Sequence, residues 1–292
     1  MTIYHHSPCA LTVQNSAPYC ALMRALFLTM LLTSLVLPSG CASVSPPSDL
    51  SGADLQTLQT QAAQGNAKAQ SDLGLLYFQG QGVPQDYLKA REWWVQAAAQ
   101  GNALAQANLG VLYEDGLGVP QDYGKARQWY EQAAAQGNAV AQFGLGWFYH
   151  KGFGVSQDYR KARQWYELVA ARGHSVAQTI LGSFYHNGLG VPQDYGRARE
   201  WYEQAAAQGE ADAQNNLGYL YLEGKGVPKD ENKGVEWIRK AAEQGDANGQ
   251  DSLGEMYHDG RGVQQDNMRA YMWYNLAVEQ YLKQGGQSME SA

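Results

Sequence analysis

The stretch Gly101–Gln136 reads GNALAQANLGVLYEDGLGVPQDYGKARQWYEQAAAQ and occurs, with small changes, six times in the 292-residue chain. Successive copies begin 36 residues apart, at Gly65, Gly101, Gly137, Gly173, Gly209 and Gly245. Each copy keeps one leucine and one tryptophan in the same place, which are Leu109 and Trp129 in this stretch. A fixed period of this length is typical of arrays in which one small unit stacks on the next. We therefore expect residues 65–280 to form one elongated domain.

Two helices are predicted within each copy. In the first copy, apolar side chains share one helical face at the spacing i, i+4, i+7 and i+8, as Ala69, Leu73, Leu76 and Tyr77. Asn66 can cap the start of this helix, and Gly80 suits the positive φ at its end. Other copies carry Asn or Asp at the cap, except that His174 and Glu210 are weaker caps. Asp86 can cap a second helix, which carries a stripe of alanine and aromatic side chains.

A glycine in the middle of each first helix departs from helix propensity, because glycine there costs about 1 kcal/mol relative to alanine. It nonetheless recurs in every copy, as Gly74, Gly110, Gly146, Gly182, Gly218 and Gly254. We expect the two helices to cross closely at this glycine, with the indole of the recurring tryptophan covering the space. One helix pair cannot bury its own apolar face, so neighbouring copies must stack.

Four motifs of each copy resemble the Sel-1-like repeat, a relative of the tetratricopeptide repeat with a longer loop. They are Gly-Asn-Ala-x-Ala-Gln, Leu-Gly-x-x-Tyr, Gly-x-Gly-Val-Pro-x-Asp and Lys-Ala-x-x-Trp-Tyr. The resemblance covers residues 65–280. It implies an all-α fold, a right-handed α-solenoid of six helix-turn-helix units that serves protein–protein interaction.

The N-terminus carries an expected export signal. The apolar run Ala25–Leu37 follows Arg24 and is shorter than the roughly 20 residues that span a bilayer as a helix. The Pro-Ser-Gly-Cys sequence that follows resembles the lipobox of bacterial lipoproteins, although Pro38 stands where an aliphatic residue is usual. The resemblance implies lipidation of Cys41 and, with Ala42 next, attachment to the outer membrane on the periplasmic side. Simple cleavage of the leader and a single-pass anchor are the alternatives.

The chain divides into five expected segments. Residues 1–41 form the leader, for which we expect Met23 to be the true start, and residues 42–54 form a Ser- and Pro-rich flexible tether. Residues 55–64 are predicted to be a capping helix, and residues 285–292 are predicted to be disordered. The solenoid spans residues 65–284, with a longer last helix and the repeats 65–100, 101–136, 137–172, 173–208, 209–244 and 245–280.

Charge and cysteine usage restrict the partners. The net charge of −7 is spread through the repeats without a basic stripe, whereas phosphate binding needs clustered Lys and Arg. We therefore expect no nucleic-acid partner, a membrane contact through the N-terminal lipid only, and a monomer. The cysteines Cys9, Cys20 and Cys41 all precede the repeats, so the array folds without disulfides.

The residues that differ between copies are the candidate binding site. In tetratricopeptide-like arrays the first helices line the concave surface, so a variable stripe on these helices should face the groove. Its candidate partner-binding residues are Asn108, Phe143, Trp147, Ile180, Asn216 and Tyr219. The repeat does not require Trp147, which is our first choice for a binding hot spot; the alternative is that it packs sideways against a neighbouring helix. The asparagines can bond an extended peptide backbone or be ordinary solvated residues.

The sequence contains no pattern typical of catalysis. Gly-x-Ser-x-Gly, Ser-x-x-Lys, His-Glu-x-x-His and the phosphate-loop motif are absent, and we expect no cofactor and no metal site. His150, His186 and His258 share one repeat position and are interpreted as surface residues. The favoured function is a non-enzymatic interaction scaffold that holds a protein or peptide in the groove. The alternatives are a cell-wall or β-lactam hydrolase, by analogy with cysteine-rich relatives, and a host-facing factor.

Overall fold

The computed structural model describes residues 52–290, which form thirteen α-helices and no strand. A single helix, α2 (Gly52–Ala63), precedes six helix pairs. The first helices of the pairs, termed the A helices, are α3 (Ala67–Gln79), α5 (Ala103–Asp115), α7 (Ala139–Lys151), α9 (Ser175–Asn187), α11 (Ala211–Glu223) and α13 (Ala247–Asp259). The second helices, termed the B helices, are α4 (Tyr87–Ala99), α6 (Tyr123–Ala135), α8 (Tyr159–Ala170), α10 (Tyr195–Ala207), α12 (Glu231–Glu243) and α14 (Asn267–Glu290).

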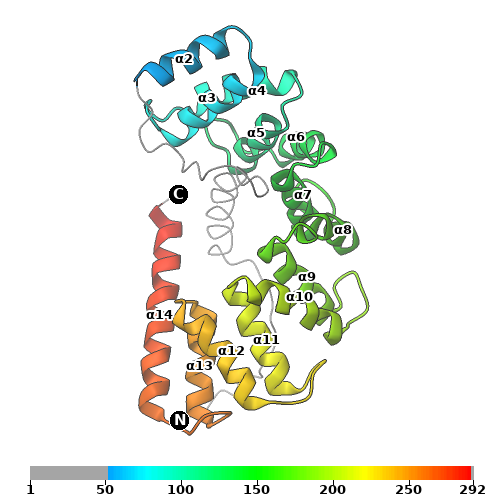
Figure 1. Ribbon diagram of the computed structural model, residues 1–292, viewed down its shortest axis with the longest axis vertical. Coiled ribbons are helices and arrows are strands. Elements are labelled where there is room, and N and C mark those ends of the chain that lie inside the picture. Colours follow the sequence, from blue (N-terminus) through cyan, green and yellow to red (C-terminus); the bar gives the residue numbers. More distant parts are fainter. Residues whose placement is uncertain (1–51, 291–292) are drawn as a thin grey trace.

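The helix pairs stack into a curved array (Figure 1). Each B helix from α4 to α12 packs between the A helix of its own pair and the A helix of the next, and α14 packs against α13. Successive A helices also contact one another, as α3 does with α5 and α11 does with α13. Among the described helices, no comparable contact joins successive B helices. The A helices therefore lie on the inner side of the curve, and the predicted all-α solenoid is confirmed.

The predicted caps begin and end the helices. Asn66 Oδ1 accepts a hydrogen bond from the backbone N–H of Ala69 at 2.9 Å, and Gly80 ends α3 with φ of 70°. His174 and Glu210 make no side-chain cap bond, as expected for weaker caps. The caps fix where each A helix starts and therefore which residues face inward.

The ends of the array differ from the sequence prediction. Helix α2 begins at Gly52, so residues 52–54 are helical rather than part of the tether. Helix α14 continues to Glu290, whereas we predicted disorder from residue 285. The helix continues through the paired glycines after Gln284, where we expected it to end. The predicted leader, with Cys41, lies outside the described residues.

A side chain of the B helix covers each mid-helix glycine, but it is not the expected tryptophan. The covering side chain is the residue after the recurring tryptophan, so it is an indole only in the first copy. A Cβ added to Gly74 would lie 2.5 Å from Trp94 Nε1, and one added to Gly182 would lie 2.5 Å from the ring of Tyr202. Ile238 takes this place in the fifth copy. The recurring tryptophans are half-buried instead.

Hydrogen bonds between two glutamine side chains and a backbone carbonyl link three helices in most copies, which the sequence did not predict. We term this arrangement the glutamine stitch. In the second copy, Gln106 Nε2 donates to the carbonyl of Ala98 on the preceding B helix at 3.3 Å. Gln136 Nε2 then donates to Gln106 Oε1 at 2.8 Å. Arg172 replaces this second glutamine in the third copy, and Gln142 Oε1 has no partner there. Where it is complete, the stitch joins the A helix to the helices on both sides.

No described helix is long and apolar enough to cross a membrane.

Candidate functional site

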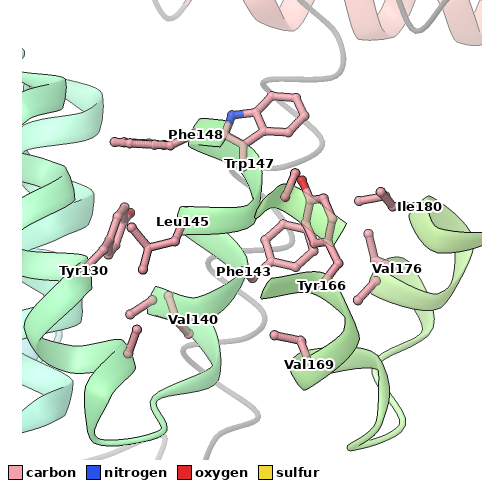
Figure 2. Close-up of a cluster of buried hydrophobic side chains, with 14 of the residues drawn as sticks. Tyr130, Val140, Phe143, Leu145, Trp147, Phe148, Tyr166, Val169, Val176 and Ile180 are labelled. Atoms are coloured by element: carbon pink, nitrogen blue, oxygen red, sulfur yellow. The ribbon is translucent and has the colours of Figure 1, made fainter. Parts of the chain in front are cut away.

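A large cluster of buried apolar side chains lies in the middle of the array, between the A and B helices (Figure 2). Phe143 and Trp147 on α7 and Ile180 on α9 belong to one cluster of buried side chains. The ring of Phe143 meets that of Tyr166 edge to face, with centroids 5.3 Å apart. Three of the six predicted site residues are thus brought together in adjacent repeats.

Trp147 is more enclosed than we expected of a groove residue, with 4% of its surface exposed. Its ring lies edge-on to His150 and Phe153, with centroids 5.8 and 6.3 Å apart. The ammonium of Lys151 lies 4.8 Å from the ring centroid, within cation–π distance. These contacts come from its own helix and the following loop. A binding role for Trp147 stays a prediction.

Asn108 on α5 is the most unusual of the predicted site residues. Only 1% of its surface is exposed, and neither its Oδ1 nor its Nδ2 has a hydrogen-bond partner. Leaving a buried polar group unpaired costs about 1–3 kcal/mol. Such groups are rare in native proteins and call for a physical reason. Asn216, at the equivalent position on α11, is half-buried.

Tyr219 on α11 links two repeats. Its hydroxyl donates to Glu255 Oε2 on α13 at 3.0 Å and lies 3.1 Å from Ser252 Oγ. Burial raises the pKa of the Tyr219 hydroxyl, so the group stays protonated at neutral pH. Tyr219, one of the predicted site residues, therefore connects α11 to α13.

Two of the three histidines are buried, which corrects the surface interpretation. His150 and His186 are each 7% exposed, whereas His258 is exposed beside Asp259. The His150 ring packs edge to face on Phe184, with centroids 5.0 Å apart. Burial, with a smaller effect of Lys151, lowers the pKa of His150 to about 4. His150 is therefore a neutral core residue at physiological pH.

Three carboxyl groups meet where α11 and α13 begin. Burial, then the neighbouring charges of Asp212 and Glu210, raise the pKa of Asp246 to about 7. Burial also raises the pKa of Asp212 and of Glu210. The sequence signal was present, because Glu210 and Asp246 are the same cap position in adjacent repeats. Residues 52–290 contain no group of three or more His, Cys, Asp or Glu side chains that can hold a metal ion.

Comparison with protein families identifies the repeat. The family model described as "Sel1 repeat" matches residues 67–102, 103–138, 139–174, 175–210, 211–246 and 247–282. This chain belongs to the Sel1 repeat family. Proteins built from Sel1 repeats are generally protein-interaction scaffolds and typically non-catalytic, so the hydrolase alternative is not favoured. No curated protein gives a match.

Two solved structures resemble this Sel1 repeat chain in both sequence and fold. A protective antigen of uropathogenic Escherichia coli strains, with the SLR fold, is 41% identical with a TM-score of 0.73. That match covers 80% of this chain but 49% of the antigen, so the chain spans about half of the antigen's length. A Sel1 repeat protein from Oxalobacter formigenes is 34% identical with a TM-score of 0.71, over 77% of this chain and 90% of that one.

Proposed function

We propose that this Sel1 repeat protein is a non-enzymatic scaffold of the bacterial cell envelope that binds an extended segment of a partner protein along its inner side. The inner positions of the A helices differ between copies, while the residues that stack the repeats recur. At one level the inner residues are Asp72, Asn108, Gly144, Ile180, Asn216 and Ser252. A rigid stack that presents such residues in advance lowers the ordering cost of binding.

The unpaired amide of Asn108 is the observation that carries this proposal. An asparagine side chain offers one acceptor and two donors, which match the N–H and C=O groups of an extended backbone. Both atoms are buried in the free solenoid, so a partner segment pairs them only when the side chains that cover Asn108 move aside; that pairing would offset the cost of leaving them unpaired.

Replacement of Asn108 by leucine tests this proposal, because a structural and a binding role predict different results. We expect Asn108→Leu to raise the midpoint of thermal unfolding, since an unpaired buried amide is removed. The same variant should lose partners captured by crosslinking in an envelope fraction. Asn216→Leu, at the half-buried equivalent position, serves as the matched control for stability. Identical partners for wild type and Asn108→Leu would contradict the inner-side assignment.

We also propose that the protein is exported and attached by lipid at Cys41 to the periplasmic side of the outer membrane. The support is the apolar run, followed by small residues before a cysteine. Growth with labelled palmitate, followed by capture of the protein, should give a labelled band. The Cys41→Ala variant should carry no label. An unlabelled wild-type protein would contradict lipidation.

A host-facing role is the second candidate, supported by the 41% identity with a protective antigen. It requires that the solenoid reach the outer surface of the cell. Protease treatment of intact cells should then cut the protein, whereas a periplasmic solenoid is cut only after the outer membrane is opened. Binding through the inner side applies to either location.

A further inference from the structure

Helix α14 carries an exposed apolar face that is unlike the rest of the molecule. The described residues include ten large hydrophobic side chains that are exposed, and seven of them lie on α14. They are Met268, Tyr271, Met272, Leu276, Val278, Tyr281 and Leu282. Contiguous exposed apolar surface on a soluble protein marks an interaction site more often than chance.

The preceding B helices show that the repeat does not require this apolar face. The position of Met272 holds Glu92, Gln128, Gln164, Glu200 and Glu236 in the five earlier copies. The position of Val278 holds alanines that the next A helix covers, such as Ala242, which is 2% exposed. Val278 itself is 55% exposed.

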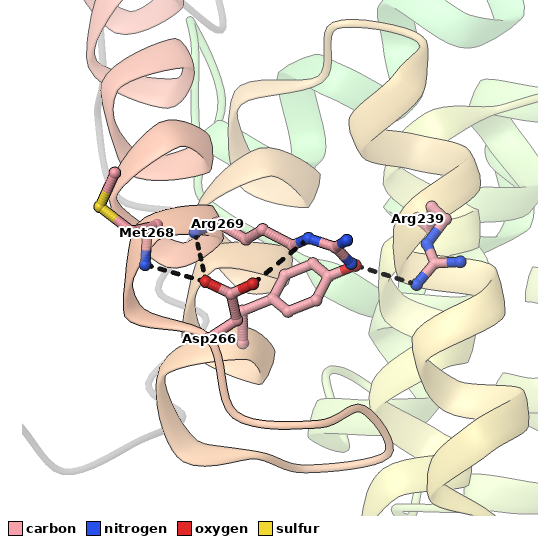
Figure 3. Close-up of polar contacts among 5 residues, drawn as sticks. Arg239, Asp266, Met268 and Arg269 are labelled. Carbon is pink, nitrogen blue, oxygen red and sulfur yellow. Dashed lines mark hydrogen bonds and ion pairs between the residues drawn. The ribbon is translucent and has the colours of Figure 1, made fainter.

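Contacts on the other side of α14 hold the helix in place (Figure 3). Asp266 Oδ1 accepts hydrogen bonds from the backbone N–H groups of Met268 and Arg269, each at 3.0 Å. The Tyr257 hydroxyl on α13 accepts from Arg239 on α12 at 3.3 Å and from Arg269 at 3.4 Å. Figure 3 shows the Met268 side chain pointing away from this polar group. The apolar face therefore belongs to a fixed helix.

Four apolar residues of the exposed face lie symmetrically about Asn275. We define the α14 stripe as Met268, Tyr271, Met272, Asn275, Val278 and Leu282. Met268 and Leu282 lie seven residues to either side of Asn275, and Met272 and Val278 lie three residues to either side. At 1.5 Å per residue the stripe is about 22 Å long. Two such stripes that run antiparallel about Asn275 place Met268 opposite Leu282 and Met272 opposite Val278, while Tyr271 lies opposite Glu279.

We propose that the α14 stripe binds the α14 stripe of a second copy of this chain, antiparallel and about a two-fold axis. In this arrangement Met268 packs against Leu282 of the second copy and Met272 against Val278. The two Asn275 amides meet at the axis, where a buried asparagine pair fixes register. Glu279 faces Tyr271, whose hydroxyl can donate to the carboxylate. The contact is the same patch on both copies, as a closed two-fold dimer requires.

A second copy fits the stripe better than a membrane does. Helices that lie on a membrane surface carry Lys and Arg beside the apolar face. Beside the α14 stripe, Lys283 is paired with Glu279 at 2.9 Å, and no excess of positive charge results. A single pair of helices buries less than the roughly 800 Å² per partner of a standard interface, so the dimer should form at micromolar concentration. This departs from the monomer expected from the sequence and does not depend on the inner-side binding proposed above.

Sedimentation velocity of the purified protein across the micromolar range tests the dimer. The sedimentation coefficient should rise from monomer to dimer with concentration. Met272→Glu, which places a charge opposite Val278, should weaken self-association at least about tenfold. Leu168→Glu alters an exposed leucine on α8 and should dimerise like the wild type. Circular dichroism confirms that both variants fold. A monomer at every concentration, or a dimer unaffected by Met272→Glu, would overturn the proposal.

Disulfide trapping tests the antiparallel register. Mild oxidation of the Asn275→Cys variant should give a covalent dimer, because the two positions meet at the axis. The Leu168→Cys variant and the wild type, which share the native cysteines near the N-terminus, should not. Flotation with vesicles of phosphatidylethanolamine and phosphatidylglycerol examines the other occupant. Vesicle binding that Met272→Glu abolishes, with no covalent dimer from Asn275→Cys, would assign the stripe to a membrane instead.

Discussion

Gly182 lies so close to the ring of Tyr202 that the pair acts as one packing unit. Tyr202 is 1% exposed and has no room to move aside for a Cβ at 2.5 Å. The same unit recurs in the other copies with Trp94, Tyr130, Tyr166, Ile238 or Tyr274 as the covering side chain. The low helix propensity of the glycine is therefore offset by close packing between the helices of one pair.

Gly182→Ala should destabilise the protein, although alanine favours the helix. Overpacking a filled core costs about 1–3 kcal/mol, more than the helix-propensity gain of about 1 kcal/mol. Gly196→Ala on α10 is the matched control, since the only close neighbour of its added Cβ is Asp194 Oδ1 at 3.3 Å. Urea denaturation should show a lower midpoint for Gly182→Ala and an equal or higher one for Gly196→Ala. A Gly182→Ala midpoint at or above wild type would contradict the packing argument.

At the residue scale, periodicity predicted that the glycine is covered but not by which ring. The recurring tryptophan and the residue after it are neighbours on the helix, and only the crossing of the helices decides which points inward. The buried histidines were missed for a different reason. The position of His150 holds Phe78 and Leu222 in other copies, which are 6% and 0% exposed. Comparison of the copies would have predicted a core position, whereas the polarity of histidine suggested the surface.

The glutamine stitch shows how single side chains tie one element to the next. It recurs as Gln70 with Gln100, Gln178 with Gln208, and Gln214 with Gln244, at distances of 2.8, 2.8 and 2.7 Å. In the third copy Arg172 instead donates to the carbonyl of Gly137 at 2.7 Å. This copy lacks the bond that its neighbours have, and Gln142 Oε1 is left unpaired.

Arg172→Gln should therefore stabilise the protein. A new hydrogen bond to the buried Gln142 Oε1 is worth about 1 kcal/mol, and the exposed arginine contact that is lost contributes less. The midpoint of thermal unfolding should rise. The same substitution made together with Gln142→Ala should give no gain, which isolates the pair as a double-mutant cycle. An equal gain in both backgrounds would show that the effect does not come from the stitch.

At the element scale, the sequence predicted the number, order and caps of the paired helices, because each signal occurs six times. The two ends were less predictable. Gly285 and Gly286 resemble helix-ending glycines, yet α14 runs through them. In the repeats the ending glycine is followed by a loop whose glutamine bonds back to the helix, as Gln85 Nε2 does to the Phe78 carbonyl at 2.8 Å. No such loop follows Gly285, so the local signal alone was insufficient.

Across the whole molecule, buried titratable groups give two parts of the array opposite changes in stability with pH. The parts are the middle, with His150 on α7, and the C-terminal end, with Asp246 at the start of α13. The pKa of His150 is lowered to about 4 in the folded state. Between about pH 4 and about pH 6.5, His150 is therefore neutral in the folded protein but protonated in the unfolded chain. Stability from this site is lost as the pH falls from about 6.5 to about 4. The pKa of Asp246 is raised to about 7, so the folded state keeps a proton that the unfolded chain releases above about 3.8. Stability from this site is lost as the pH rises through that range.

Hydrogen exchange should reveal this opposition, because stability in a repeat array is set locally. After correction for intrinsic rates, α7 and α9 should be less protected at about pH 5 than at about pH 7, and α13 should be more protected. Asp246→Asn removes the charge and keeps a good cap, since Asn66 caps α3 in the same way. That variant should raise the protection of α13 at about pH 7 and reduce its pH dependence, with the remainder coming from Asp212 and Glu210. A uniform response along the array would contradict the assignment.

Of the candidate site, the sequence predicted the inner-facing helices but not the state of each side chain. Positions that vary between copies identified α5, α7, α9 and α11. Whether a side chain there is open or enclosed depends on its neighbours in the next repeat, as the contact of Tyr219 with Glu255 illustrates. The unpaired state of Asn108 likewise has no signature in a sequence. Spacing in one repeat cannot report on contacts between repeats.

The equal spacing of the contacts between repeats has a consequence for how the gene can change. Gln106 and Gln142 each donate to an alanine carbonyl on the preceding B helix, Ala98 and Ala134, both at 3.3 Å. Recombination between two copies, which removes or adds one whole repeat, therefore joins surfaces that already fit each other. A chain that lacks residues 103–138 should fold cooperatively, with its helical circular dichroism reduced in proportion. The reach of the solenoid can thus be lengthened or shortened in evolution by duplication or deletion, without the invention of any new interface.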